Sequence, residues 1–333
     1  MLSTEPLPLA PTPPGHPGPA SAAKRGGTLR RRDIAALVAA GCLAFLLLAH
    51  GLIPERYGLR LIIESALPWL ALPIVLLLAL TAITRSRLGV LAAGLCSLVW
   101  LGVFGPNLLP LASPTAAVSA SPDITVISQN LDASNTNPDQ TVRDLLAAKP
   151  DVLVLEEFTG NLDAATMTAL NAALPHTSQV GTVAVFSTRA IIDVEPLKLG
   201  LPWSRAFHGE LQSDAGPISF YAIHADSVRP DQYTIRDTML RQLSTVVAAD
   251  PSPRIITVGD FNASSTDSSL HPLQRTLNEP RQTGGGLGFT WPAALPLTRP
   301  DHVFVKGLDA TRMSVLDAPG SDHRGILATL AAG

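Results

Sequence analysis

Residues 255–262 read IITVGDFN, and this stretch sets the fold class. Ile255–Val258 is a short apolar run rich in β-branched residues, which predicts a buried strand. After Gly259, Asp260 and Asn262 place two polar side chains just past the end of that strand. Taken alone, this motif fits a turn as well as a functional site, because Asp and Asn favour loops for their local hydrogen bonding. The rest of the chain decides between the two interpretations.

Short apolar runs of the same kind recur on both sides of this stretch and predict further strands. They are Ile124–Ser128, Asp151–Leu155, Val183–Ser187, Ala206–Leu211, Ile218–His224, Asp301–Val305 and Ile326–Leu330. Helical spacing predicts helices between them, at Thr141–Ala148, Asp163–Leu174 and Gln232–Ala249. Strands interleaved with helices favour an α/β domain of two packed sheets with helices outside, and we assign residues 123–333 to it.

The front of the chain has a different character. Residues 1–33 are rich in Pro, Ala and Gly and end in a basic cluster, which predicts a disordered basic tail. Residues 34–111 contain three apolar runs, at about 34–53, 62–84 and 88–111, each near the 20 residues that a membrane-spanning helix needs. We therefore expect a membrane anchor of three transmembrane helices, followed by a Pro/Ser/Ala linker at 112–122. The alternatives are buried helices of a soluble core and a twin-arginine export signal at Arg31-Arg32.

Basic residues near the span ends predict the orientation of the anchor. Five lie in the tail, and Arg85 and Arg87 flank the second short connector, whereas Arg56 and Arg60 in the first connector are partly offset by Glu55. With the tail inside the cell, three spans place the domain on the extracytoplasmic side of the cell membrane.

Charge divides the chain in the same way as hydropathy. The chain is 46% apolar and only 15% charged, with net charges of +5 over residues 1–122 and −8 over residues 123–333. Nucleases follow a polyanion with a basic surface, so this acidic domain makes extended DNA or RNA a poor substrate. Both cysteines, Cys42 and Cys96, fall in apolar runs, which excludes a disulfide within the domain.

Polar side chains gather where the predicted strands end or begin. They are Asn130, Asp132, Glu156, Glu157, His224, Asp260, Asn262, Asp301, His302, Asp322 and His323. Carboxylate and amide oxygens suit a hard divalent cation, and histidines beside them suit proton transfer and oxyanion stabilisation at a phosphate. Each motif alone is weak evidence, but together they indicate a phosphate-processing site.

These motifs, in this order, resemble those of the endonuclease/exonuclease/phosphatase family. The resemblance is carried by Asn130-Leu131-Asp132, Leu155-Glu156-Glu157, Ala222-Ile223-His224, Gly259-Asp260-Phe261-Asn262, Arg299-Pro300-Asp301-His302 and Ser321-Asp322-His323. The strand VAVFSTR at 183–189 is similar to a further family segment. With the apolar spans in front, the chain looks like the membrane-anchored branch that includes VanJ-type glycopeptide-resistance proteins.

The resemblance implies a four-layer α/β sandwich and metal-dependent hydrolysis of a phosphoester, with Mg²⁺ expected and Mn²⁺ or Ca²⁺ as alternatives. By motif, Glu157 and Asn130 would bind the metal, with Asp132 and Asp322 as further ligands. Asp260 would orient or deprotonate the attacking water, and Asn262 would hold the water or the phosphate. His224 and His323 would contact the phosphate, with His323 oriented by Asp301.

Two positions depart from the family pattern: Glu156 stands where Gln is usual, and His302 where Tyr is usual. The extra negative charge of Glu156 could alter metal affinity. The function expected is hydrolysis of a small or lipid-linked phosphate or pyrophosphate at the membrane, with a polyprenyl cell-wall carrier as the first substrate to test and glycopeptide resistance as a phenotype. The alternatives are a phospholipid phosphodiesterase of the sphingomyelinase type, a surface nuclease and a non-catalytic binding module.

Overall fold

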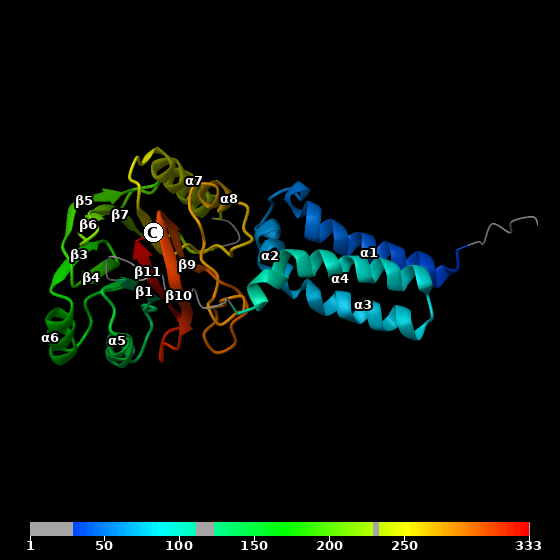
Figure 1. The fold of residues 1–333 in the computed structure, drawn as a ribbon, viewed down its shortest axis with the longest axis horizontal. Coiled ribbons are helices and arrows are strands. Elements are labelled where there is room, and N and C mark those ends of the chain that lie inside the picture. The colour runs from blue at the N-terminus through cyan, green and yellow to red at the C-terminus, as the bar shows by residue number, and fades with distance from the viewer. Residues whose placement is uncertain (1–28, 111–122, 229–232, 333) are drawn as a thin grey trace, which may run out of the picture.

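The structure is a computed structural model that describes residues 29–110, 123–228 and 233–332. These residues form a bundle of long helices and an α/β domain (Figure 1). The predicted linker, 112–122, and most of the predicted tail lie outside the described residues. The helices form an elongated bundle that meets the domain at one end (Figure 1).

The helices of the bundle follow the predicted apolar runs closely. They are α1 (Arg31–Ala49) with the 3₁₀ turn η1 (His50–Leu52), α2 (Leu59–Ala66), the 3₁₀ turn η2 (Leu67–Leu70), α3 (Ala71–Ile83) and α4 (Arg87–Leu108). The second run is broken at η2, which contains Pro68, a residue without the N–H that a continuous helix requires. Stretches Arg31–Leu52, Leu59–Ile83 and Arg87–Leu108 are long and apolar enough to cross a membrane.

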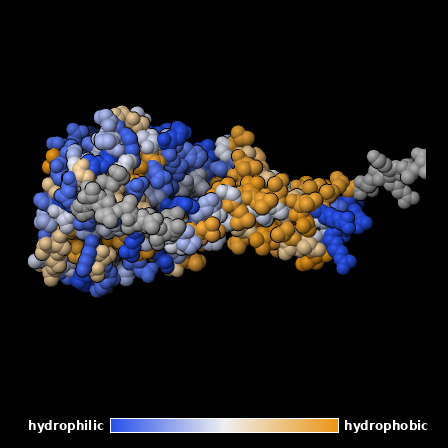
Figure 2. Space-filling view, in the orientation of Figure 1, coloured by the Kyte–Doolittle hydropathy of each residue, from blue (hydrophilic) through white to orange (hydrophobic). Residues whose placement is uncertain are grey.

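The outer surface of the bundle is apolar, whereas the surface of the domain in the same view is largely hydrophilic (Figure 2). Leu48, Leu91 and Leu98 are each about two-thirds exposed, at 66%, 70% and 67%. A water-soluble protein rarely exposes so large a continuous apolar surface. At the end of the bundle away from the domain, the Ser86 hydroxyl donates to Asp33, so the Arg31 and Arg87 ends of two helices lie together.

The domain contains two mixed sheets with helices on their outer faces, which confirms the predicted fold class. The six-stranded sheet has the order β10-β11-β1-β2-β4-β3 and the five-stranded sheet the order β5-β6-β7-β8-β9. The strands are β1 (Ile124–Asn130), β2 (Val152–Glu156), β3 (His176–Val180), β4 (Val183–Ser187), β5 (Ile191–Leu197), β6 (Ala206–Leu211), β7 (Ile218–His224), β8 (Ile255–Asp260), β9 (Asp301–Lys306), β10 (Leu308–Leu316) and β11 (Gly325–Ala332). The sequence did not predict β3, β5 or β10.

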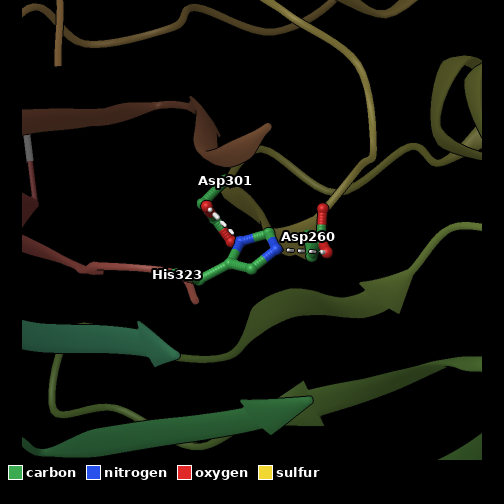
Figure 3. Close-up of side chains that lie close together, drawn as sticks. All are labelled: Asp260, Asp301 and His323. Atoms are coloured by element: carbon green, nitrogen blue, oxygen red, sulfur yellow. Dashed lines mark hydrogen bonds and ion pairs between the residues drawn. The ribbon is translucent and has the colours of Figure 1, made fainter. Parts of the chain in front are cut away.

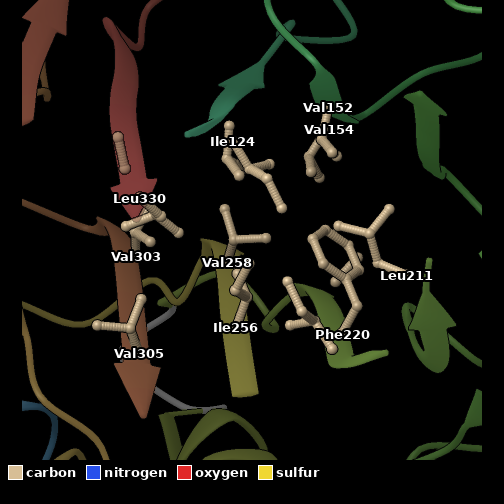
Figure 4. Packing of buried hydrophobic residues seen from close by; sticks show 14 of the residues in the cluster. Ile124, Val152, Val154, Leu211, Phe220, Ile256, Val258, Val303, Val305 and Leu330 are labelled. Atoms are coloured by element: carbon tan, nitrogen blue, oxygen red, sulfur yellow. The ribbon is translucent and has the colours of Figure 1, made fainter. Parts of the chain in front are cut away.

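Apolar side chains fill the spaces between the layers. Val154 of the first sheet and Phe220 and Val258 of the second are fully buried between the two sheets (Figure 4). The helices α5 (Pro138–Ala147) and α6 (Ala164–Ala173) cover the six-stranded sheet, and α7 (Tyr233–Ala249) and α8 (His271–Gln274) cover the five-stranded sheet. The order is helices, sheet, sheet, helices.

The bundle packs directly on the domain. The Arg281 side chain donates to the carbonyl of Pro106 at 2.6 Å, and the Gly286 N–H donates to the carbonyl of Asn107 at 2.7 Å. On α2, the carbonyl of Glu64 accepts from the Thr266 hydroxyl at 2.6 Å. These contacts hold the two parts together independently of residues 111–122.

Candidate active site

Three candidate site residues occupy neighbouring positions at one end of strands in the five-stranded sheet. His224 of β7 pairs in register with Asp260 of the parallel strand β8, and Asp260 pairs with Asp301 of the antiparallel strand β9. Adjacent strands lie about 4.8 Å apart, so the register alone brings these side chains together. All three are buried, with relative exposures of 1%.

The six-stranded sheet contributes further site residues from the ends of its strands β1 and β2. Asn130 at the end of β1 pairs with Glu156 at the end of the parallel strand β2, and Glu157 follows directly. The side-chain amide of Asn130 donates to Oδ2 of Asp260 at 3.0 Å. This hydrogen bond joins the two sheets and fixes the spacing of the two halves of the site.

His323 completes the buried cluster from the turn before β11 (Figure 3). Its Nδ1 lies 3.0 Å from Oδ2 of Asp301, and its Nε2 lies 3.9 Å from Oδ2 of Asp260. Thr290 donates its hydroxyl to the same oxygen of Asp301, which holds that carboxylate in place. Burial alone would lower the pKa of His323, but Asp301 and Asp260 outweigh it and raise that pKa to about 10.

The pKa values of Asp260 and His224 are shifted in the direction that favours the neutral form of each group. Burial raises the pKa of Asp260, and the nearby Asp301 carboxyl adds to the rise, although His323 opposes it. Burial, Arg205 and His323 together lower the pKa of His224 well below its usual range. The Arg205 guanidinium nitrogen Nη2 lies 2.8 Å from both ring nitrogens of His224, and this adjacent positive charge favours the neutral ring. The site therefore holds one protonated and one neutral imidazole.

Several residues of the site, or residues next to it, have backbone conformations with positive φ. Gly259 has φ +140°, and a Cβ there would lie 1.9 Å from the carbonyl oxygen of Ile223 on the neighbouring strand. Asp132, Glu157 and Asn262 have positive φ values of 58°, 56° and 49°. Non-glycine residues adopt this region at some energetic cost, and such strain concentrates at functional sites.

Glu157, Asp132 and Asp322 form the more exposed rim. Glu157 accepts from the N–H of Ala133 at 2.7 Å, and its Oε1 lies 3.7 Å from Nε2 of His224. Asp132 accepts from the N–H of Ser134 at 2.8 Å. Asp322 accepts from the indole N–H of Trp291 at 3.0 Å.

The two departures from the family pattern have different surroundings. Glu156 is fully buried and accepts from the Ser128 hydroxyl at 2.7 Å, and burial raises its pKa well above the usual range. Burial thus favours the neutral form of Glu156 and opposes an extra negative charge beside Glu157. His302 is also fully buried, and its ring nitrogens lie 2.7 Å from Oε1 of Glu279 and 2.7 Å from the carbonyl of Ala263. These contacts hold the His302 ring in the interior, and His302 does not line the cavity.

Two sets of residues could hold a metal ion. Within the described residues, Asp260, Asp301 and His323 offer ligand atoms within 4.8 Å of one another. Asp301, however, already accepts from Thr290 and contacts His323. The second set is Asn130 and Glu157, with Asp132 and Asp322, and all four line the cavity. The oxygen donors in both sets fit a hard divalent cation such as Mg²⁺.

These residues line one cavity of about 840 Å³. Eight of the nine candidates predicted from sequence face it: Asn130, Asp132, Glu157, His224, Asp260, Asn262, Asp322 and His323. Asp301 lies behind His323 and contacts it. The sequence motifs did not identify Arg205 or Trp291, which lie outside them. They also gave no sign that α2 of the bundle forms part of the cavity wall.

Comparison with solved structures shows the same fold in proteins of low sequence identity. An endonuclease/exonuclease/phosphatase family protein from Bacteroides thetaiotaomicron matches with a TM-score of 0.52 and 17% identity, over 64% of this chain and 99% of that one. The mannosyl-6-phosphatase Bt3783 of Bacteroides thetaiotaomicron matches with a TM-score of 0.50 and 17% identity, over 62% of this chain and 99% of that one. Truncated Caenorhabditis elegans TDP2 matches with a TM-score of 0.50 and 16% identity, over 63% of this chain and 98% of that one. No curated protein matches the chain.

Residues 127–323 match the sequence pattern of the Endonuclease/Exonuclease/phosphatase family, a range that includes every candidate site residue. Members of this family are phosphoesterase hydrolases. The matched range exceeds half of the chain and includes strands of both sheets. The chain belongs to the endonuclease/exonuclease/phosphatase family.

Proposed function

We propose that this protein is a membrane-anchored, divalent-metal-dependent phosphoesterase that hydrolyses a small or lipid-linked phosphate or pyrophosphate on the extracytoplasmic side. One observation supports the hydrolytic activity in particular. Asp260, His323 and Asn130 come together from two sheets at the base of one cavity. A neutral phosphate-binding imidazole and a charged one, beside a cluster of oxygen donors, suit attack of water on a phosphoester.

The residues have distinct roles in this proposal. Asp260 orients the attacking water or accepts its proton, and Asn262, whose N–H donates to Oδ1 of Asp260 at 2.8 Å, supports that carboxylate. His323, oriented by Asp301, donates to the oxygens of the phosphate, and His224 binds the phosphate from the neighbouring strand. Glu157 and Asn130, with Asp132 and Asp322 beside them, would hold the metal. A bound divalent cation would neutralise phosphoryl charge.

The membrane location rests on the three apolar helices and their exposed apolar surface. The orientation rests on charge: Arg31, Arg32, Arg85 and Arg87 lie at the end of the bundle away from the domain. Basic flanks favour the cytoplasmic side, so the domain lies outside. A reporter fused after residue 115 should be active only outside the cytoplasm, and activity only inside would reverse the orientation.

The substrate is proposed from the anchor and the charge. A site fixed at a membrane meets lipid head groups at a raised effective concentration, and the net charge of −8 over residues 123–333 disfavours a polyanion such as DNA. A polyprenyl phosphate or pyrophosphate of cell-wall synthesis is the first substrate to test, and glycopeptide resistance the first phenotype.

The test is phosphate release by the full chain in detergent micelles containing a polyprenyl pyrophosphate, with and without Mg²⁺. Mn²⁺ and Ca²⁺ are compared in parallel. We expect metal-dependent release that Asp260→Ala and His323→Ala abolish, whereas Asp309→Asn, an exposed carboxylate on β10, retains it. Cleavage of plasmid DNA or sphingomyelin without phosphate release would instead indicate a nuclease or a phosphodiesterase. If both site variants still protect cells from glycopeptides as the parent does, catalysis is not the function.

A further inference from the structure

One wall of the active-site cavity comes from the helical bundle. Leu61, Ile62, Ser65, Trp69 and Leu72 line the cavity opposite Asp260 and His323. Their spacing is three or four residues, with Ile62 beside Leu61, so they form one stripe along α2, η2 and the first turn of α3. The cavity thus has a charged side made by the domain and a largely apolar side made by the bundle.

The position of this wall is fixed by a polar contact on the other face of α2. The Glu64 carboxylate is 1% exposed and accepts from the backbone N–H of Ser268 at 3.1 Å. The Glu64 carbonyl accepts from the Thr266 hydroxyl at 2.6 Å. Both partners lie in the loop that follows Asp260 and Asn262, so α2 is docked on the segment that continues from the catalytic strand.

Trp69 holds the far end of the wall. Its indole N–H donates to the carbonyl of Leu297 at 2.8 Å, and its ring stacks on Phe289 with centroids 5.7 Å apart. Leu297 and Trp291 continue the apolar lining on the domain side and are each 40% exposed. A belt of exposed apolar side chains therefore surrounds the mouth of a cavity whose base is charged.

The chemistry of the occupant follows from this polarity. A small water-soluble phosphate would fill the charged base and leave Ile62 and Leu72, 61% and 65% exposed, uncovered on the cavity side. Removing methylene groups from water is favourable, so an apolar chain attached to the phosphate gains affinity there. The stripe also runs into α3, the helix whose apolar surface we place in the membrane. The wall is thus continuous with the lipid phase.

We propose that this stripe of Leu61, Ile62, Ser65, Trp69 and Leu72 is a binding site for the hydrocarbon chain of a phosphate-bearing lipid, whose phosphate lies at Asp260 and His323. The anchor is then a specificity-determining part of the active site as well as an attachment. This inference rests on the proposed phosphoesterase function.

The experiment compares two substrates that share a phosphate monoester and differ in chain length, dimethylallyl phosphate and farnesyl phosphate. The readout is the ratio of their kcat/KM values for the full chain in detergent with Mg²⁺. The wall variant is Ile62→Ser with Leu72→Ser. The control variant is Leu59→Ser with Val75→Ser, which makes the same change at residues 49% and 64% exposed on α2 and α3 that do not line the cavity.

We expect the wall variant to lower the farnesyl-to-dimethylallyl ratio about tenfold, and the control to keep the parental ratio. A farnesyl phosphate carrying a photoreactive chain should also label residues 59–72 in the parent. An unchanged ratio in the wall variant, while the parent hydrolyses farnesyl phosphate, would overturn the chain site and leave the phosphoesterase function standing. An equal fall of this ratio in the wall and control variants would also overturn the chain site, because it would show only a general effect of a less apolar bundle. If the parent hydrolyses neither ester, this inference fails. If the parent also releases no phosphate from the polyprenyl pyrophosphate, the proposed function fails as well.

Discussion

Nδ1 of His323 lies 3.0 Å from Oδ2 of Asp301, although the two residues come from different strand ends and opposite sheets. This contact orients the imidazole so that its Nε2 points toward Asp260 (Figure 3). It also supplies much of the negative charge that raises the pKa of His323 to about 10. The pair therefore sets both the direction and the protonation state of the ring.

Replacing Asp301 by Asn should remove both effects. We expect kcat for phosphate ester hydrolysis to fall about 10²- to 10⁴-fold, since the imidazole would be misoriented and, with a lower pKa, less of it would be protonated. Because Asp301 raises the pKa of His323, its loss should move the alkaline limb of the pH–rate profile to lower pH. Asp309→Asn is the control. A parental pH profile in Asp301→Asn would mean that Asp301 does not act through His323.

The adjacent pair Glu156 and Glu157 should respond in opposite ways to the same substitution. Glu156 is fully buried against Ser128, and burial raises its pKa and favours its neutral form. Glu156→Gln keeps the shape of the side chain without a charge, so it should retain activity within about twofold. Glu157 lines the cavity as the proposed metal ligand, so Glu157→Gln should need a higher Mg²⁺ concentration, about 10- to 100-fold. Titration of activity with Mg²⁺ measures both. Equal Mg²⁺ requirements in the two variants would contradict the assignment of Glu157.

Gly259 should not tolerate a side chain. In Gly259→Ala the new Cβ would overlap the Ile223 carbonyl oxygen, 1.9 Å away, so β8 must move relative to β7. We expect a loss of about 1–3 kcal/mol of unfolding free energy and reduced activity, because Asp260 is the next residue on the displaced strand. Thermal unfolding of the full chain in detergent measures the first effect. Gly284→Ala, where no atom lies within 4 Å of the added Cβ, serves as control. Unaltered unfolding in Gly259→Ala would show that the strands can separate without cost.

Stability should depend on pH through Asp250, which is remote from the active-site cavity. Burial would raise the pKa of Asp250, but hydrogen bonds from Ser219, Ser252 and Tyr221 outweigh it and lower that pKa to about 2. A carboxyl with a lowered pKa stabilises the folded state above its unfolded pKa of about 4, and this contribution is lost as the pH falls toward 2.

Asp250→Asn should therefore lower the melting temperature near neutral pH, by an amount equivalent to roughly 1 kcal/mol after allowance for solvent screening. The difference from the parent should shrink as the pH is lowered from about 4 to 2. Circular dichroism melting curves across this range measure it, with Asp309→Asn as the exposed control. A difference that stays constant with pH would show that lost packing, not ionisation, is responsible.

Sequence patterns identified the buried strands well and the edge strands poorly. Val183–Ser187, Ala206–Leu211 and Ile218–His224 have the predicted bounds, since each is a continuous or alternating apolar run in the interior of a sheet. The strands missed, β3, β5 and β10, lie at sheet edges. These three strands are partly exposed, so residues such as those of His176–Val180 carry no strong apolar pattern for sequence reasoning to detect. The remaining edge strand, β9, is buried and was predicted.

The sequence by itself determined the division into an apolar, basic-flanked helical part and an acidic α/β domain, because hydropathy and charge are properties of local composition. It also determined the candidate residues, because strands end where polar residues replace apolar ones. Only the tertiary structure decided how they meet. Register placed Asp260 between His224 and Asp301, and sheet packing brought Asn130 to Asp260.

The tertiary structure also decided what the anchor does beyond attachment. From the sequence, Leu61–Leu72 was an apolar stretch like its neighbours, joined to the domain through a linker. Its docking through Glu64 on the loop after Asp260, far away along the chain, makes it a wall of the active-site cavity. Contacts between residues so distant in sequence depend on the packing of whole elements, which no local pattern encodes.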